Sequence, residues 1–392
     1  MWPFSRAAKY EAVATDEEQK ANDDDAIKRP SSSKRWTLLV WSFVLLVTIV
    51  AIATVSVTSI HNRAGKQEEN IVAEDEINPL NQNSRNTTSA LEVDVVCPLR
   101  REWRSLSTTE QKDYITSVRC LLDKPSILGP NCTRYDDWPY IHSHVGYYTH
   151  HSAPFLPWHR YFLHIYETTL RQECGYTGSL VYWDWTLDAD DLAHSTIFSP
   201  DTGFGGDGDV TGAKTVGNSG HCVVDGPFSD IKAKFYDTKA FPHCLSRGFH
   251  DDQGVLGHID GHDITPESID QVLQVDTYES FVAQLESKVH DAIPFGIGGD
   301  FETFTAPYDP LFFLHHTQLD RLWWLWQQRD DGKRVNSYGG HNHRHSVEQA
   351  KLEDEITMQG LAPPIKVQQV MDTENGFLCY RYQSGHAVSS SS

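Results

Sequence analysis

Residues 141–167 read IHSHVGYYTHHSAPFLPWHRYFLHIYE, and residues 289–324 read VHDAIPFGIGGDFETFTAPYDPLFFLHHTQLDRLWW. The first stretch sets six histidines beside an aromatic and aliphatic run, and the second sets three in similar surroundings. Neutral imidazole is a good ligand for transition metals such as copper, and neither stretch holds a cysteine. Two such clusters, separated by more than a hundred residues, predict a metal centre rather than isolated core histidines.

Helices are expected around both clusters, so the predicted fold class is mainly α, with long loops and a few short strands. A Ser/Thr cap signal precedes the first expected helix, and apolar residues at four-residue spacing mark the third. Frequent glycine and poor periodicity between residues 201 and 263 predict loops over a rigid core. The four expected helices are Thr108–Leu122, Pro157–Glu173, Tyr278–Asp291 and Pro310–Arg329.

Three strings resemble the copper motifs of the tyrosinase family. FLPWHRYFLHIYE (155–167) and ECGYTGSLVYWDWTLDA (173–189) are similar to the first motif, and TAPYDPLFFLHHTQLDRLWW (305–324) is similar to the second. The resemblance covers about residues 97–326 and looks nearest to tyrosinase-like enzymes of fungal peptide natural-product pathways. It implies a four-helix core that holds two copper ions, with three histidines for each.

For the first copper, the resemblance assigns His142, His150 and His159. His150 follows His142 by eight positions and precedes His159 by nine, which fits the family pattern. His144 and His151 are near-duplicates in sequence and remain alternatives.

For the second copper, the resemblance assigns His290 and His316, and here the chain departs from the family. The family carries a further histidine four residues after the first, on the same helix face. Pro294 stands at that position. Proline has no ligating atom, and we expect it to end the helix.

Three explanations of the missing ligand stay open. A histidine from elsewhere completes the site, with His258 and His262 of the HIDGH segment as candidates. Alternatively, water or Asp291 fills the place, or the second copper binds weakly and the activity is altered. His315 is expected to lie beside the ligands rather than among them.

The resemblance implies oxygenation of a phenol to a catechol, or oxidation of a catechol to a quinone, with dioxygen. The substrate is a phenolic small molecule or a tyrosine of a peptide. Asp291 is the candidate base or water-orienting group for loss of the phenol proton, or else a helix-end residue bonded to backbone. Asp320 is expected to orient an imidazole or to pair with an arginine. The alternatives are a catechol oxidase without hydroxylase activity and a non-catalytic dioxygen- or copper-binding relative.

Outside this region, residues 36–60 form an uncharged apolar run that is long enough to span a bilayer. Four Lys and Arg residues lie just before it, so the N-terminus is expected to be cytoplasmic and the rest lumenal or extracellular. The expected organisation is a disordered cytoplasmic tail (1–35), a transmembrane helix (36–60), a lumenal stalk (61–95), the dicopper domain (96–385) and a disordered tail (386–392).

Charge and cysteine content agree with this placement. The formal net charge of −21 argues against nucleic-acid binding, because phosphate backbones attract cationic surfaces. Seven dispersed cysteines predict up to three disulfides and one free thiol, with the pairing left open. Asn86 and Asn131 begin glycosylation sequons.

Overall fold

The structure is a computed structural model that describes residues 97–374 and 376–383 of the 392-residue chain. The segments expected as tails, transmembrane helix and stalk (1–35, 36–60, 61–95 and 386–392) lie outside these residues. Among the described residues, no helix combines the length and the apolar character needed to cross a membrane.

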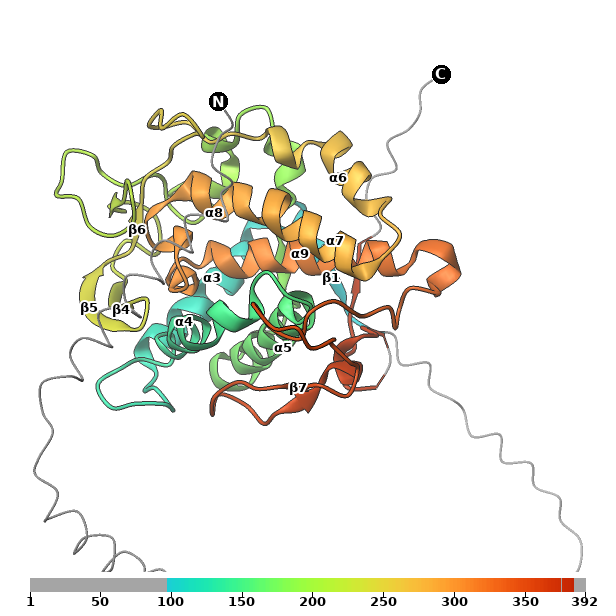
Figure 1. Cartoon of the computed structure of the whole chain (residues 1–392). Coiled ribbons are helices and arrows are strands. Elements are labelled where there is room, and N and C mark those ends of the chain that lie inside the picture. The colour runs from blue at the N-terminus through green and yellow to red at the C-terminus, as the bar shows by residue number, and fades with distance from the viewer. Residues whose placement is uncertain (1–96, 375, 384–392) are drawn as a thin grey trace, which may run out of the picture. The chain divides into compact units, whose positions relative to one another are not determined.

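Helices build the core, and Figure 1 shows α5 and α9 running beside each other at its centre. The α-helices are α3 (Thr108–Asp123), α4 (Asp137–Thr149), α5 (Phe155–Cys174), α6 (Pro266–Leu273), α7 (Tyr278–Gln284), α8 (Asp291–Ile297) and α9 (Leu311–Gln327). The π-helical turn Leu285–His290 joins α7 to α8. Short 3-10 helices cover Trp103–Ser105, Trp185–Asp188, Leu192–His194, Thr196–Phe198, His262–Ile264, Gly299–Glu302, Ala306–Tyr308, Arg329–Gly332 and Val367–Val370.

The four expected helices are largely confirmed, with corrections. Neither α4 nor α6 was predicted from the sequence, and the third helix extends beyond its expected end at Asp291. Pro294 does not end that helix, because α8 continues through it to Ile297. Pro294 lies inside α8, four residues after the end of the π-helical turn Leu285–His290, and the helix runs through both features.

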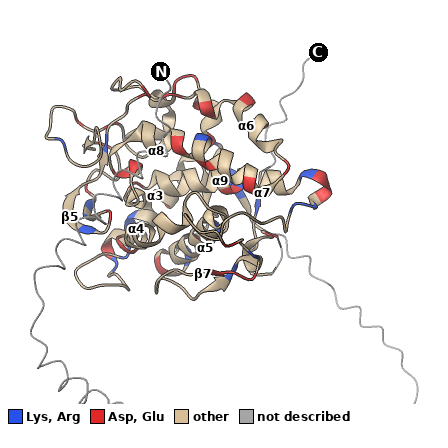
Figure 2. Ribbon diagram, in the orientation of Figure 1, with Lys and Arg blue, Asp and Glu red and all other residues tan. Residues whose placement is uncertain are grey.

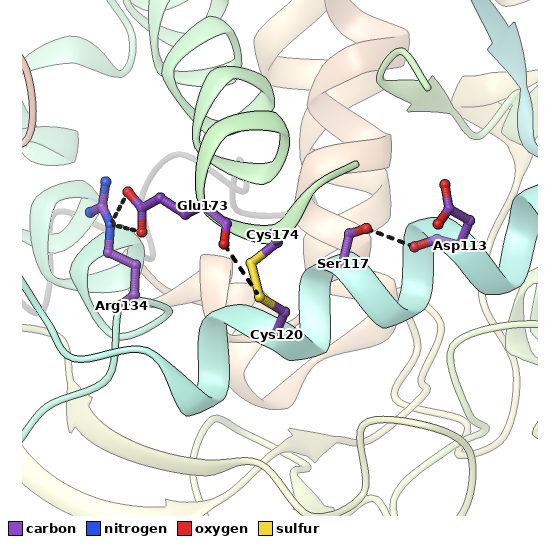
Figure 3. The surroundings of a disulfide bond; sticks show 6 residues. All are labelled: Asp113, Ser117, Cys120, Arg134, Glu173 and Cys174. Carbon is purple, nitrogen blue, oxygen red and sulfur yellow. Dashed lines mark hydrogen bonds and ion pairs between the residues drawn. A yellow bond between two sulfur atoms is a disulfide. The ribbon is translucent and has the colours of Figure 1, made fainter. Parts of the chain in front are cut away.

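A disulfide fastens α3 to α5, and an ion pair beside it joins the segment between α3 and α4 to the same end of α5 (Figure 3). Cys120 of α3 is bonded to Cys174 at the end of α5, and Arg134 Nε lies 3.1 Å from Glu173 Oε1 beside it. A capping box starts α3, in which Ser107 and Glu110 satisfy each other's backbone N–H groups.

Three disulfides and one free thiol are present in the described part, as the cysteine count predicted. Besides Cys120–Cys174, they are Cys97–Cys379 and Cys222–Cys244, and Cys132 is the free cysteine.

Strands are few and short. The parallel sheet has the order β2 (Val181–Tyr182), β1 (Leu99–Glu102), β9 (Arg381–Tyr382), so a late strand pairs with the first. The antiparallel pairs are β3 (His221–Cys222) with β6 (Ser246–Arg247), β4 (Lys232–Tyr236) with β5 (Lys239–Cys244), and β7 (Glu355–Ile356) with β8 (Ile365–Lys366).

A buried charge network ties α5 and α9 to this parallel sheet. Asp320 of α9 accepts hydrogen bonds from Arg160 of α5 and Arg100 of β1, and from the hydroxyls of Tyr380 and Tyr382. Two roles were expected for Asp320, and the structure supports that of an ion-pair partner of arginine. Outside this network, charged side chains of both signs lie on the turn Arg329–Gly332 that follows α9, which has no buried residue (Figure 2).

Candidate metal centre

The six histidines of the centre come from four segments that meet in the core. His142 lies on α4, His150 caps its C-terminus and His159 lies on α5. His290 ends the π-helical turn, and two adjacent histidines, His315 and His316, lie on α9. All six are buried.

Backbone carbonyls fix the first three rings in one tautomer. The Nδ1–H groups of His142, His150 and His159 donate to the carbonyls of Phe304 (2.6 Å), Gly146 (2.8 Å) and Phe155 (2.7 Å). Because a carbonyl can only accept, each Nδ1 must carry the proton, and each neutral ring keeps a lone pair on Nε2.

The Nε2 atoms of His142 and His159 lie 3.3 Å apart. The distance suits a hydrogen bond, but neither nitrogen carries a proton when both Nδ1 atoms are donors. Two facing lone pairs repel each other unless a cation lies between them. One ring nitrogen from each of His142, His150 and His159 lies within 4.8 Å of the others, which gives a three-nitrogen metal site.

Burial keeps these rings neutral. It lowers the pKa of His142 to about 4, and burial together with the neighbouring histidines lowers the pKa values of His150 and His159 well below the usual range. Neutral imidazole is the form that ligates a metal, so the rings are prepared for binding near neutral pH.

The second cluster holds His290, His315 and His316, which also offer ring nitrogens within 4.8 Å of one another. His290 Nδ1 donates to Asp291 Oδ1 at 2.9 Å, which leaves its Nε2 free. His315 instead meets the indole of Trp185, whose Nε1–H donates to His315 Nδ1 at 3.2 Å. Nδ1 of His316 has no hydrogen-bond partner in the described part of the chain.

The two clusters form one centre. The rings of His159 and His316 stack with centroids 4.2 Å apart, and those of His150 and His290 are 5.8 Å apart. The structure therefore brings together all five histidines that the sequence assigned to copper, and adds His315, which the sequence placed only beside them.

Aromatic rings enclose the histidines. Phe155 lies 5.2 Å from the rings of both His150 and His290, and the half-buried Phe304 lies 5.3 Å from His150, centroid to centroid. Gly146 makes room for Phe304, since a Cβ there would lie 2.6 Å from its ring. Such a wall suits an aromatic substrate and limits access of water.

Glu286, which the sequence reading missed, braces the loop after His150. Its carboxylate oxygens accept the backbone N–H of His151 at 2.9 and 2.8 Å, where His151 adopts a φ of 54°. Burial and the nearby Asp291 raise the pKa of Glu286 well above its usual value. The sequence does hold a signal for Glu286, because it precedes His290 by four residues and is therefore expected near the same side of a helix.

The remaining candidates stay outside the centre. His144 is exposed, and its Nδ1 donates to the Tyr140 carbonyl of its own helix. His258 and His262 are exposed and pair with Asp251 and Asp260. The HIDGH segment therefore does not supply the missing ligand.

Comparison with known proteins matches residues 132–329 to the common central domain of tyrosinase. The chain belongs to the tyrosinase family.

Two curated relatives and one solved structure agree with the assignment. The chain is 47% identical over 302 residues to the tyrosinase-like protein phomQ1 of Diaporthe leptostromiformis, covering 73% of this chain and 77% of that protein. It is 47% identical over 285 residues to the tyrosinase ustQ of Aspergillus flavus, with 72% and 79% covered. The structure of a single-substitution mutant of a polyphenol oxidase from Thermothelomyces thermophila superposes with a TM-score of 0.64 at 28% identity, with 74% and 89% covered.

This tyrosinase-family chain is accordingly a copper oxidoreductase that oxidises a phenolic substrate with dioxygen. The histidine clusters fit copper, since both offer imidazole without thiolate and the facing Nε2 atoms of His142 and His159 require a cation.

Proposed function

We propose that the chain binds two copper ions, one at His142, His150 and His159 and one at His290 and His316. The proposal for the first site rests on two facing nitrogens. The Nε2 atoms of His142 and His159 lie 3.3 Å apart, and both Nδ1 atoms are donors, so each Nε2 keeps a lone pair for a metal ion. The stacking of the His159 and His316 rings supports a second site beside the first.

The bound copper pair supplies the reduction of dioxygen, and the protein supplies geometry, burial and proton handling. Asp291 holds the His290 ring through Oδ1, while its Oδ2 is buried without a partner among the described residues. We propose Oδ2 as the acceptor for the proton that a phenol loses. Hydroxylation of the phenol then depends on Asp291 more than oxidation of a catechol does.

The proposed substrate is a phenol, either a free phenol or a tyrosine side chain on a peptide. The likeness to the phomQ1 and ustQ proteins supports a phenolic substrate in a fungal pathway. The altered second site, with Pro294 in place of a histidine, favours catechol oxidation without hydroxylation as the alternative activity. The same change favours a weakly loaded, non-catalytic copper-binding protein as the next candidate.

Copper counting on the purified protein tests this function directly. We expect two coppers per chain. Oxygen uptake is then measured with tyrosine, a tyrosyl peptide and a simple catechol, and we expect uptake with a phenol as well as with the catechol. Activity on the catechol alone favours the oxidase alternative. Fewer than two coppers, with no turnover of any substrate, contradicts the enzyme and favours the non-catalytic protein.

We also propose that residues 36–60 anchor the enzyme in a membrane, with the domain on the lumenal or extracellular side. The uncharged run and the three disulfides support this, since disulfides persist in oxidising compartments. The exposed Asn131, in a turn with a φ of 65°, is then available for glycosylation. Protease treatment of intact microsomes should spare the domain and remove residues 1–35, and a degraded domain contradicts the proposed orientation.

A further inference from the structure

His315 is fully buried on α9, between the copper ligand His316 and the indole of Trp185. An indole Nε1–H can only donate, so His315 Nδ1 must accept it. The neutral ring then carries its proton on Nε2, which is the reverse of the tautomer at His142, His150 and His159.

This tautomer excludes His315 as the missing ligand. Its ring nitrogen lies close enough to those of His290 and His316 for a three-histidine site by distance alone. A nitrogen that bears a proton has no lone pair to give a metal, so the hydrogen bond to Trp185 decides against coordination despite the short distance.

The segment that carries Trp185 is held firmly against α9. Trp183 N–H donates to the Leu314 carbonyl at 3.4 Å, and Gln318 Nε2 donates to Asp184 Oδ1 at 3.0 Å. These contacts lie on both sides of His315 along α9, so the indole cannot easily turn away. The tautomer is therefore set by the fold.

The Nε2–H of His315 is buried and has no hydrogen-bond partner among the described residues. Buried donors are rarely left unsatisfied, and this one belongs to a ring centred 5.2 Å from those of both His290 and His316. Pro294 offers no donor atom at the position where the family carries its third ligand. An open coordination position and an unused hydrogen-bond donor thus occur at the same site.

We propose that a small exogenous ligand, a water molecule or a small anion, takes the open position at the second copper and accepts a hydrogen bond from His315 Nε2–H. Two protein imidazoles and this ligand complete the site, and His315 positions the ligand without binding the metal. The inference rests on the proposed function, because it requires copper at His290 and His316.

The experiment uses the full chain loaded with copper, and azide as the probe anion. His315→Asn keeps an acceptor near Nδ1 for Trp185 but removes the donor at Nε2, whereas His315→Gln places an amide N–H near Nε2. Both variants should keep two coppers per chain. His315→Asn should weaken azide binding about tenfold, the effect of one lost charge-assisted hydrogen bond, and His315→Gln should restore most of it.

His316→Ala is the control for a lost ligand and should retain about one copper per chain. If both His315 variants also fall to one copper, His315 is a ligand and the inference is wrong. If both keep two coppers and bind azide as the wild type does, the proposed donor is also wrong. Wild-type protein that holds no copper would instead refute the dicopper function itself. Trp185→Phe is an independent test. It removes the indole donor that keeps the proton on His315 Nε2, so azide binding should weaken while the copper count stays unchanged.

Discussion

Replacement of Asp320 by asparagine should destabilise the fold more than loss of any single surface charge. Asp320 Oδ1 accepts from Arg160 Nε at 2.5 Å, and Oδ2 accepts from Arg100 at 3.3 Å and from Tyr380 at 2.7 Å, with Tyr382 also in contact. All four partners are donors. Asparagine removes the negative charge and replaces one accepting oxygen by an amide N–H₂, from which neither arginine can accept a hydrogen bond.

The magnitude follows from burial. The side chains of Arg100 and Arg160 are fully buried and that of Asp320 is 3% exposed. The substitution therefore leaves Arg100 with Glu167 as its carboxylate and removes the carboxylate that pairs with Arg160. Removing one partner of a buried ion pair costs about 3–5 kcal/mol. For a domain of this size that corresponds to a fall in Tm of roughly 6–20 °C.

Thermal unfolding of Asp320→Asn at pH 7, followed by circular dichroism, checks this value. Asp230→Asn is the matched control, because Asp230 also pairs with an arginine through two hydrogen bonds, of 2.7 and 2.8 Å to Arg119, but is 63% exposed. An exposed pair contributes about 0–1 kcal/mol. Equal destabilisation by the two substitutions would refute the argument from burial.

The pH dependence gives a second check. Burial acts to raise the pKa of Asp320, but the charges of Arg160 and Arg100 outweigh it and lower the pKa below its usual value. A lowered carboxyl pKa stabilises the fold above the unfolded value of about 3.9, and this contribution is lost as the pH falls through the folded pKa. The difference in the free energy of unfolding between wild type and Asp320→Asn should therefore decrease below pH ~4.

Three further substitutions probe other parts of the molecule. Pro294→His should tighten the second copper at least about tenfold in chelator competition, because it restores a ligand one turn after His290; unchanged affinity in a folded variant counts against the open position. Asp291→Ala should reduce phenol hydroxylation at least about tenfold more than catechol oxidation, and equal losses in the two assays argue against its role as the proton acceptor. The hydrogen bond and charge of Asp300 outweigh burial and raise the pKa of His243. The free energy of unfolding of the wild type, measured in urea, should therefore exceed that of His243→Gln most below pH ~6.5, and the excess should disappear as the pH rises through the folded pKa of His243. A difference that does not depend on pH would contradict this prediction.

The clustering of the histidines was predictable because residue type and spacing carry the information. His142, His150 and His159 follow the family pattern, and the structure places them in one cluster with facing nitrogens. His290 and His316 were also identified correctly as parts of the centre. The departure at Pro294 is a change of residue type at one position of the motif, so it too can be read from the amino-acid sequence.

Local propensity explains what was missed. Helix α4 contains Pro139 near its start and Gly146 near its end, both poor helix formers, so its sequence reads as a loop. Packing of Trp138, Ile141 and Val145 in the core overrides that preference. These three residues lie at positions i, i+3 and i+7, a helical period that was the available signal.

The role of His315 depends on a contact across 130 residues, the hydrogen bond with Trp185. No spacing rule relates these two positions, so the tautomer of His315 could not be inferred from the sequence. The same holds for the pairing of Cys97 with Cys379, which are 282 residues apart. The cysteine count fixed the number of disulfides but not their partners.

The location of Cys379, Tyr380 and Tyr382 bears on the order of events during biosynthesis. These residues bond to Cys97 and Asp320, and they are translated after every histidine of both clusters. A nascent chain therefore has every histidine of both clusters before it has the two tyrosines that complete the hydrogen bonds to Asp320.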